Sequence, residues 1–334
     1  MGLIDFIHRL AGKSSPSLPQ AFSREELLKY LKLNKRIQAI NQGHNGLVVS
    51  GIKSGNKTGI ISAKLSTAYG LTQIGRKQTN QDAMTLWIGA RGDLLLGVAD
   101  GVSEYGSADV ASALTMLEMV ERIKRGAAFD PDLVRSLQGK IVAINDAQVR
   151  VKCLGTTFSS AYVVGNQASI MHVGDSLVFK VKKNGGIELL TYPHSPRAMD
   201  NHARFAGELP YSERDTVRIL GYKESAIRFF VGSRLPGEIP LIKIDLEPGD
   251  KLFLMTDGVY SPFLVPEDFI GMIKDAVDAG GDDQAVIAER IVRAVIKLPR
   301  ARDNITLIVY CHKGDIAETS TSSPHGIKCL PLRI

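Results

Sequence analysis

Short, strongly apolar runs that end in Gly, Asp or Asn are the feature that most constrains how this chain can fold. Many of the runs contain β-branched residues, and this composition between turn formers predicts β-strands. Gly165-Asn166 and Asn184-Gly185 separate successive runs and are typical of hairpin turns. The predicted strands cover residues 93–99, 157–164, 168–173, 177–181, 187–190, 241–244, 251–255 and 305–310.

Helical patterns interrupt these strands. Apolar residues recur at helical spacing over residues 107–124, 130–149, 266–277 and 282–296. Strands with helices grouped in pairs predict an α+β fold, in which antiparallel sheets are covered by helices. Residues 192–237 show little periodicity, so we expect a long loop or flap there.

The composition is that of an ordinary globular protein. Of the 334 residues, 44% are hydrophobic and 23% are charged, which excludes a wholly disordered or fibrous chain. No run approaches the ~18 apolar residues that a transmembrane helix needs. The three cysteines (Cys153, Cys311 and Cys329) are scattered and the N-terminus lacks a secretion signal, so we expect a cytoplasmic protein without a disulfide framework.

Basic charge is concentrated near the N-terminus. Residues 1–66 contain ten Lys and Arg but three Asp and Glu, whereas the remainder contains 31 basic and 32 acidic residues. We therefore predict a basic extension with short helices over residues 1–64, a main domain over 65–314 and a polar, mobile tail over 315–334. For the basic charges, a solvated flank is favoured over an element that binds an anionic surface.

The extension begins with a short amphipathic pattern. Leu3, Ile4, Ile7 and Leu10 form an apolar stripe on a helix predicted over residues 3–11. Because so short a helix is marginal on its own, it needs a surface to pack on. We favour packing on protein over contact with an anionic membrane surface, and the sparse aromatic residues argue against nucleic-acid binding.

Aspartates stand at the ends of the predicted strands or beside turn formers. A single Asp after a strand is usually a turn residue, because its side chain can hydrogen-bond the local backbone. Several of them at one sheet edge would repel one another, and Mg²⁺ or Mn²⁺ with oxygen ligands would relieve that repulsion. Periodicity alone does not show that the strands converge. The aspartates in question are Asp82, Asp100, Asp175, Asp257 and Asp303.

The order of the motifs around these aspartates resembles that of the metal-dependent protein serine/threonine phosphatases of type 2C, in particular the bacterial type. The resemblance covers residues 65–312, about three quarters of the chain. Each motif is short, but the order and spacing together are specific. The motifs are GRKQTNQDA at 75–83, VADG at 98–101, GTT at 155–157, HVGDS at 172–176, TDG at 256–258 and DNIT at 303–306.

This resemblance implies a sandwich of two antiparallel β-sheets flanked by helices, with two or three Mn²⁺ or Mg²⁺ ions at the sheet edges. By motif, Asp100 matches the carboxylate that bridges two metals, with the Gly101 carbonyl as a further ligand. Asp257 and Asp303 match the other carboxylates of the first metal. The implied chemistry is attack of a metal-activated water on phosphorus.

Two more aspartates have roles by resemblance. Asp82 matches an accessory acid of the site, and Asp175 matches a ligand of a third, weaker metal site. We expect His172, which lies near Asp175 in the sequence, to pack or hydrogen-bond beneath it, because no second His lies at ligand spacing.

The sequence departs from the family pattern where substrate phosphate would bind. Lys77 stands where the family often has Arg, with Arg76 beside it, and we expect one of the two to contact the phosphate. Lysine lacks the bidentate fork of arginine. Gln81 replaces a family Glu, and Val102 replaces the His that serves as a candidate general acid in animal-type members, so the general acid is not identified.

The sequence therefore predicts a cytoplasmic phosphoserine/phosphothreonine protein phosphatase that opposes a protein kinase in signalling. The alternative is a weak or inactive family member that binds phosphoproteins as a regulator, for which the substitution at Lys77 is the support. A third hypothesis makes the basic extension the working part, as a lipid- or nucleic-acid-binding segment.

Overall fold

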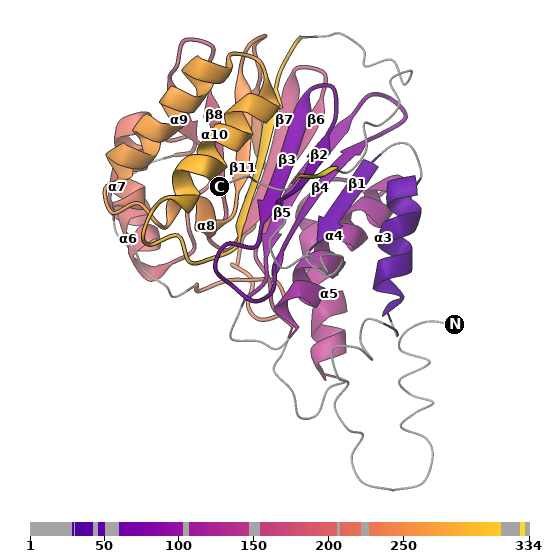
Figure 1. Ribbon diagram of the computed structural model, residues 1–334. Helices are drawn as coiled ribbons and strands as arrows, with labels where there is room; N and C mark the ends of the chain where they lie inside the picture. The colour runs from indigo at the N-terminus through magenta and orange to yellow at the C-terminus, as the bar shows by residue number, and fades with distance from the viewer. Residues whose placement is uncertain are drawn as a thin grey trace, which may run out of the picture.

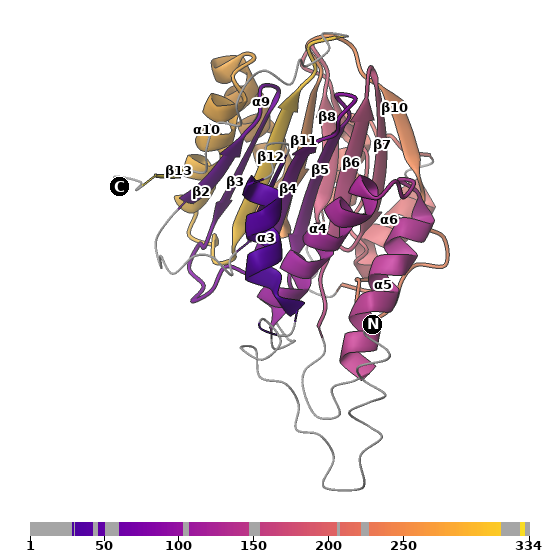
Figure 2. The same cartoon turned by 90° about the vertical axis from the view of Figure 1, so that its right-hand side faces the viewer.

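The computed structural model describes residues 29, 31–42, 46–50, 60–102, 107–146, 154–205, 208–221, 227–314 and 328–330. Two antiparallel sheets pack face to face, and helices cover both outer sides (Figures 1 and 2). The predicted sandwich flanked by helices is confirmed. The helix predicted over residues 3–11 lies outside the described residues.

Six strands form the first sheet, and every neighbouring pair is antiparallel. Its strands in spatial order are β1 (Gly46–Ser50), β4 (Asp82–Ile88), β5 (Leu94–Asp100), β6 (Phe158–Val164), β7 (Gln167–Val173) and β10 (Ile242–Asp245). The second sheet has seven strands, again all antiparallel. In order they are β13 (Lys328–Leu330), β2 (Ile60–Lys64), β3 (Ala68–Gln73), β12 (Ile305–Cys311), β11 (Lys251–Met255), β8 (Leu177–Val181) and β9 (Ile187–Leu189).

Each sheet has its own helical cover (Figure 1). The helices over the first sheet are α3 (Leu33–Gln42), α4 (Ala108–Lys124) and α5 (Pro131–Asp146). Those over the second sheet are α6 (Pro196–Phe205), α7 (Glu213–Leu220), α8 (Asp257–Tyr260), α9 (Pro266–Gly280) and α10 (Gln284–Ile296). Within the described ranges, no helix is long and apolar enough to cross a bilayer.

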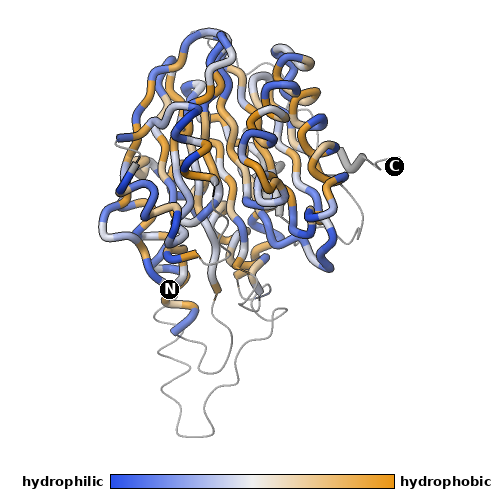
Figure 3. Tube along the Cα trace, turned by 90° about the vertical axis from the view of Figure 1, so that its left-hand side faces the viewer, coloured by the Kyte–Doolittle hydropathy of each residue, from blue (hydrophilic) through white to orange (hydrophobic). Residues whose placement is uncertain are grey.

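The apolar core has three layers, one between the sheets and one beneath each set of helices. Leu86 and Val98 of the first sheet meet Leu254 and Ile308 of the second in the central layer. Hydrophobic residues follow the interior strands, whereas hydrophilic residues gather on the loops and outer helix faces (Figure 3). Burial of this apolar area stabilises the sandwich. Polar residues are found instead at its rim, where the strands end.

The eight predicted strands are present, with ends within one residue of the prediction. The prediction of a long loop over residues 192–237 was wrong in part, because α6 and α7 lie there. Helix α7 has eight residues, and its apolar positions are Val217, Ile219 and Leu220, too few to reveal a helical period. Ser212 caps it by accepting a hydrogen bond from the Asp215 amide, at 3.3 Å.

Segments from outside residues 65–314 take part in both sheets. Strands β1 and β2 belong to the predicted extension, and β13 belongs to the predicted tail. β1 pairs with β4, whereas β2 lies between β13 and β3. The sheets therefore continue beyond the predicted limits of the main domain.

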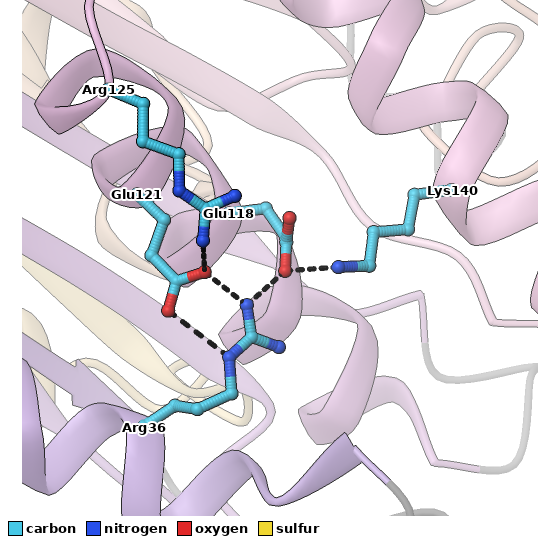
Figure 4. Close-up of polar contacts among 5 residues, drawn as sticks. All are labelled: Arg36, Glu118, Glu121, Arg125 and Lys140. Atoms are coloured by element: carbon cyan, nitrogen blue, oxygen red, sulfur yellow. Dashed lines mark hydrogen bonds and ion pairs between the residues drawn. The ribbon is translucent and has the colours of Figure 1, made fainter. Parts of the chain in front are cut away.

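An ion-pair network holds α3 against α4 (Figure 4). Arg36 lies between Glu118 and Glu121, and its Nε is 3.1 Å from Glu121 Oε1. Lys140 reaches Glu118 from α5, while Arg125 Nη2 lies 3.6 Å from Glu121 Oε2. Burial by itself would raise the pKa of the Glu118 carboxyl, but the hydrogen bonds from Arg36 and Lys140 outweigh it and lower the pKa.

Arg36→Met should destabilise the protein by about 2 kcal/mol at pH 7, less than the ~3–5 kcal/mol of a fully buried pair because Arg36 is partly exposed. A lowered pKa means that the Glu118 carboxylate stabilises the fold above its ordinary pKa of 4.5 and ceases to do so as the pH falls through the folded value. The difference in urea unfolding free energy between the two proteins should therefore shrink below pH 4.5. Arg135→Met, which removes an exposed pair with Asp132, is the control and should change stability by less than about 0.5 kcal/mol.

Candidate active site

The ends of four strands bring aspartates together at one edge of the sandwich. Asp82 begins β4 and Asp100 ends β5, and the two face each other across the strand pair. Asp257 follows β11 by two residues, and Asp303 precedes β12 by two. Because β11 and β12 are antiparallel neighbours, the end of one lies beside the start of the other. Both Asp303 and Asp257 lie close enough to Asp82 to raise its pKa.

Asp175 joins this group from the turn between β7 and β8. The Tyr260 hydroxyl of α8 donates a hydrogen bond to the Asp175 carbonyl oxygen at 2.7 Å, which ties this turn to the helix that Asp257 begins. The charge of Asp257 helps to raise the pKa of Asp175. The structure thus gathers all five aspartates that the sequence singled out.

Burial and repulsion from neighbouring carboxylates make four carboxyl groups of this site hard to ionise, those of Asp82, Asp100, Asp175 and Asp257. Burial raises the pKa of Asp82 to about 7 and that of Asp257 to about 6, with further contributions from neighbouring carboxylates. The pKa values of Asp100 and Asp175 are raised well above their ordinary range, chiefly by burial. A cation at this edge would favour the charged forms and relieve the repulsion.

Three carboxylate oxygens of the group fit a hard divalent cation. They are buried and find no hydrogen-bond partner among the described residues, although buried polar atoms are normally satisfied. An all-oxygen, carboxylate-rich set is what Mg²⁺ and Mn²⁺ prefer. In the described part of the chain, no three Asp, Glu, His or Cys side chains lie close enough together to form a ready-made site for one ion. The three oxygens are Asp82 Oδ1, Asp175 Oδ1 and Asp257 Oδ1.

Asn304 fixes the loop that carries the candidate phosphate-binding residues. Its side-chain Nδ2 donates to the carbonyl oxygens of Ile74 at 2.8 Å and Thr79 at 3.0 Å, and its Oδ1 accepts from the Gln81 backbone amide at 2.8 Å. Gly75 has φ 62°, and a Cβ there would lie 1.9 Å from the Asp303 carbonyl oxygen. The loop therefore packs directly on Asp303 and needs glycine at this contact.

The two basic residues of this loop, Arg76 and Lys77, contact different parts of the structure. Lys77 Nζ lies 3.1 Å from Asp303 Oδ1, at the edge of the carboxylate group. Arg76 is exposed, and its Nη1 lies 3.5 Å from the Pro299 carbonyl oxygen. Of the two predicted residues, Lys77 is thus the one that faces the aspartates.

His172 packs and hydrogen-bonds beneath the Asp175 turn, as predicted. Its Nδ1 lies 2.8 Å from Ser159 Oγ and its Nε2 lies 3.0 Å from the Tyr192 carbonyl oxygen. Burial, with a smaller effect from the neighbouring His194, lowers the pKa of His172 well below its ordinary value. A neutral His172 uses both ring nitrogens in this way, and its partner Ser159 also lies 3.2 Å from the Ser176 carbonyl oxygen, next to Asp175.

Sequence reasoning missed three residues that support the site. Asn304 holds the Lys77 loop, and Thr256 and Thr306 donate to the Asp82 carboxylate. The available signal was their position, since each of the three lies within three residues of a motif aspartate. Their partners, however, lie far away along the chain, and no local pattern identifies them.

Comparison with known sequences gives one consistent result. The family model described as protein phosphatase 2C matches residues 69–295. A putative protein phosphatase 2C-type of Streptococcus pyogenes is 23% identical over 255 residues, covering 74% of this chain and 98% of that protein. Protein phosphatase PhpP of Streptococcus pneumoniae is 23% identical over 243 residues, covering 65% of this chain and 94% of its own.

Solved structures share the fold. The serine/threonine phosphatase Stp1 from Staphylococcus aureus superposes with a TM-score of 0.60 at 19% identity, over 75% of this chain and 97% of that one. The catalytic domain of the serine/threonine protein phosphatase PstP, solved in complex with two manganese ions, gives a TM-score of 0.55 at 21% identity, over 75% and 98% of the two chains. At these identities the structures support the architecture of the sandwich.

Proposed function

Because the chain belongs to the protein phosphatase 2C family and its relatives include bacterial phosphatases, we propose that it hydrolyses phosphoserine and phosphothreonine in proteins with a metal-activated water. The observation that carries the proposal is the group of five aspartates at one edge of the sandwich, three of them with a buried oxygen that has no partner among the described residues. A protein kinase must supply such a substrate.

The proposed ligands for Mn²⁺ or Mg²⁺ are Asp100, the Gly101 carbonyl, Asp257 and Asp303, with Asp82 and Asp175 as further acids of the site. When bound, the metals would activate water as a nucleophile and offset negative charge on the phosphoryl oxygens. Hydrogen bonds to the backbone of Asp100 hold the Asp100–Gly101 pair in place. The Asp100 amide donates to Thr157 Oγ1 at 2.8 Å, and the Asp100 carbonyl accepts from the Thr157 amide at 2.8 Å.

Gly101 is proposed to present a bare backbone carbonyl to the site. A Cβ at this position would lie 2.3 Å from the Ala108 carbonyl oxygen at the start of α4, so the strand end and the helix start are in direct contact. Ser112 strengthens this contact, because its hydroxyl donates to the Gln81 carbonyl next to Asp82. Helix α4 thereby fixes the ends of both β4 and β5.

Lys77→Ala should raise KM for a phosphothreonine peptide about tenfold and lower kcat less, because Lys77 lies beside the carboxylates and would hold the substrate phosphate as a point charge. Arg76→Ala is the matched control from the same loop and should leave KM within about twofold, since Arg76 is turned toward Pro299. Steady-state kinetics at saturating Mn²⁺ measure both. An Arg76 effect larger than that of Lys77 would reverse the assignment.

The function is tested with the full chain, a phosphothreonine peptide and released phosphate as the readout. We expect turnover in the presence of Mn²⁺ or Mg²⁺ and none after chelation. Tight binding of the peptide without release of phosphate would favour the alternative, a phosphoprotein-binding regulator. Release of phosphate that persists in excess EDTA would contradict the metal-dependent proposal.

A further inference from the structure

Hydrogen bonds to the Asp82 carboxylate cross from one sheet of the sandwich to the other. Thr306 Oγ1 of β12 donates to Asp82 Oδ2 at 2.6 Å, and Thr256 Oγ1, at the end of β11, donates to the same oxygen at 2.9 Å. All three residues are at most 1% exposed. Two donors on Oδ2 fix the carboxylate and leave Oδ1, which is buried and without a partner among the described atoms, available to a cation.

The hydrogen of each hydroxyl in this group can be assigned. Thr306 has one hydrogen and gives it to Asp82, so in the 2.7 Å contact between Thr72 and Thr306 the donor must be Thr72. The Thr72 oxygen in turn accepts from Asn80 Nδ2 at 2.8 Å, and Asn80 Oδ1 accepts from the Asp82 amide at 3.1 Å. The ring of bonds closes on Asp82 and gives its carboxylate one orientation.

The hydroxyl of Thr256 binds Asp82 instead of capping its own helix. Thr256 is the N-cap residue of α8, and a threonine at this position normally accepts a hydrogen bond from the first turn of its helix. Its side chain makes no such bond. Instead the hydroxyl donates to Asp82 and accepts from the Thr306 amide at 3.1 Å. The helix therefore lacks a side-chain cap, and the threonine hydroxyl holds the Asp82 carboxylate instead.

We propose that Thr256 and Thr306 are positioning residues, which orient Asp82 so that its free Oδ1 serves the divalent-cation site. This inference rests on the proposed function in so far as that function places the cations beside Asp82. Residues that hold a metal-binding side chain typically contribute 10- to 100-fold (order of magnitude) to metal affinity. Without its two donors, the buried carboxylate would turn toward other partners or take up a proton.

The experiment measures Mn²⁺ dissociation constants by isothermal titration calorimetry on the full chain. Thr256→Val and Thr306→Val should each weaken Mn²⁺ binding about tenfold, whereas Thr306→Ser, which keeps the hydroxyl, should remain within about threefold of wild type. Thr85→Val is the matched control, because Thr85 lies on β4, is fully buried and has a hydroxyl without a partner among the described residues. It should leave the affinity unchanged.

A double-mutant cycle separates positioning from general loosening of the fold. In the Asp82→Ala background, Thr306→Val should change the Mn²⁺ dissociation constant less than about twofold, because the group that Thr306 orients is gone. An equal loss in both backgrounds would overturn the proposal, and so would wild-type affinity in Thr306→Val. If Asp82→Ala weakens Mn²⁺ binding but Thr306→Val does not, the positioning role fails while the proposed metal site stands. If the wild-type chain binds no Mn²⁺, both fail.

Discussion

Asp100→Asn is expected to lower kcat/KM for a phosphothreonine peptide by at least about 10³-fold. Asp100 faces Asp82 across the strand pair and is close enough to Asp257 to feel its charge, and it is the carboxylate proposed above as a ligand of the cations. The amide of asparagine has nearly the same shape but no charge. Phosphate release at saturating Mn²⁺ measures the effect, and calorimetry should show that Mn²⁺ binding is weakened in parallel.

The same substitution should not unfold the chain. In the metal-free protein, burial first and then four neighbouring carboxyl groups disfavour a charged Asp100, so replacing it by a neutral amide leaves the melting temperature unchanged or raises it. Asp245→Asn is the control, since Asp245 is an exposed aspartate at the end of β10, opposite the start of β7. It should keep wild-type turnover and affinity. Near wild-type turnover of Asp100→Asn would contradict the two-metal proposal.

Gly258→Ala should destabilise the protein by about 3 kcal/mol and weaken Mn²⁺ binding. A Cβ at Gly258 would lie 1.8 Å from the Asn304 carbonyl oxygen, and a backbone oxygen within this sandwich cannot move aside as a flexible side chain would. The strain falls between Asp257 and Asp303, which flank the contact. Urea unfolding measures the loss of stability, and calorimetry measures the loss of affinity.

Gly271→Ala in α9 is the same chemical change as Gly258→Ala but should have the opposite effect on stability. Nothing lies within 4 Å of a Cβ built at Gly271, and the residue is in the middle of a helix. Alanine there should stabilise the protein by about 0.5–1 kcal/mol, because glycine loses more backbone entropy in a helix. If both substitutions had the same effect, the proposed contact between Gly258 and Asn304 would not be the cause.

Local chemistry accounts for what could be predicted from the sequence. The strands β8 and β11 have the predicted limits, because short apolar runs bounded by Gly, Asp and Asn leave little choice of structure or of ends. The five aspartates could be named for a similar reason, since an acid at or near either end of a buried strand has to lie at the rim of a sheet. That the five aspartates come together in space was predicted only from the resemblance to the family.

The helices of the segment over residues 192–237 show where local patterns give too little information. Helices α6 and α7 are short, and much of their stability comes from tertiary packing: α6 packs on α7, and α7 packs on β9 and α9. The pairing of β1 and β13 with their neighbours has the same origin, because a sheet edge offers hydrogen bonds to segments that are remote in the sequence.

The sequence by itself determined eight of the thirteen described strands, the turns between them and the acidic residues, since each depends on a few contiguous side chains. The tertiary structure alone decided that Lys77 rather than Arg76 faces the carboxylates, because Asn304 and the contact at Gly75 fix the loop from the other end of the chain. It also decided that the hydroxyl of Thr306 serves Asp82, 224 residues away. Such contacts follow from the packing of two sheets, and packing depends on the shape of the whole core rather than on any local pattern.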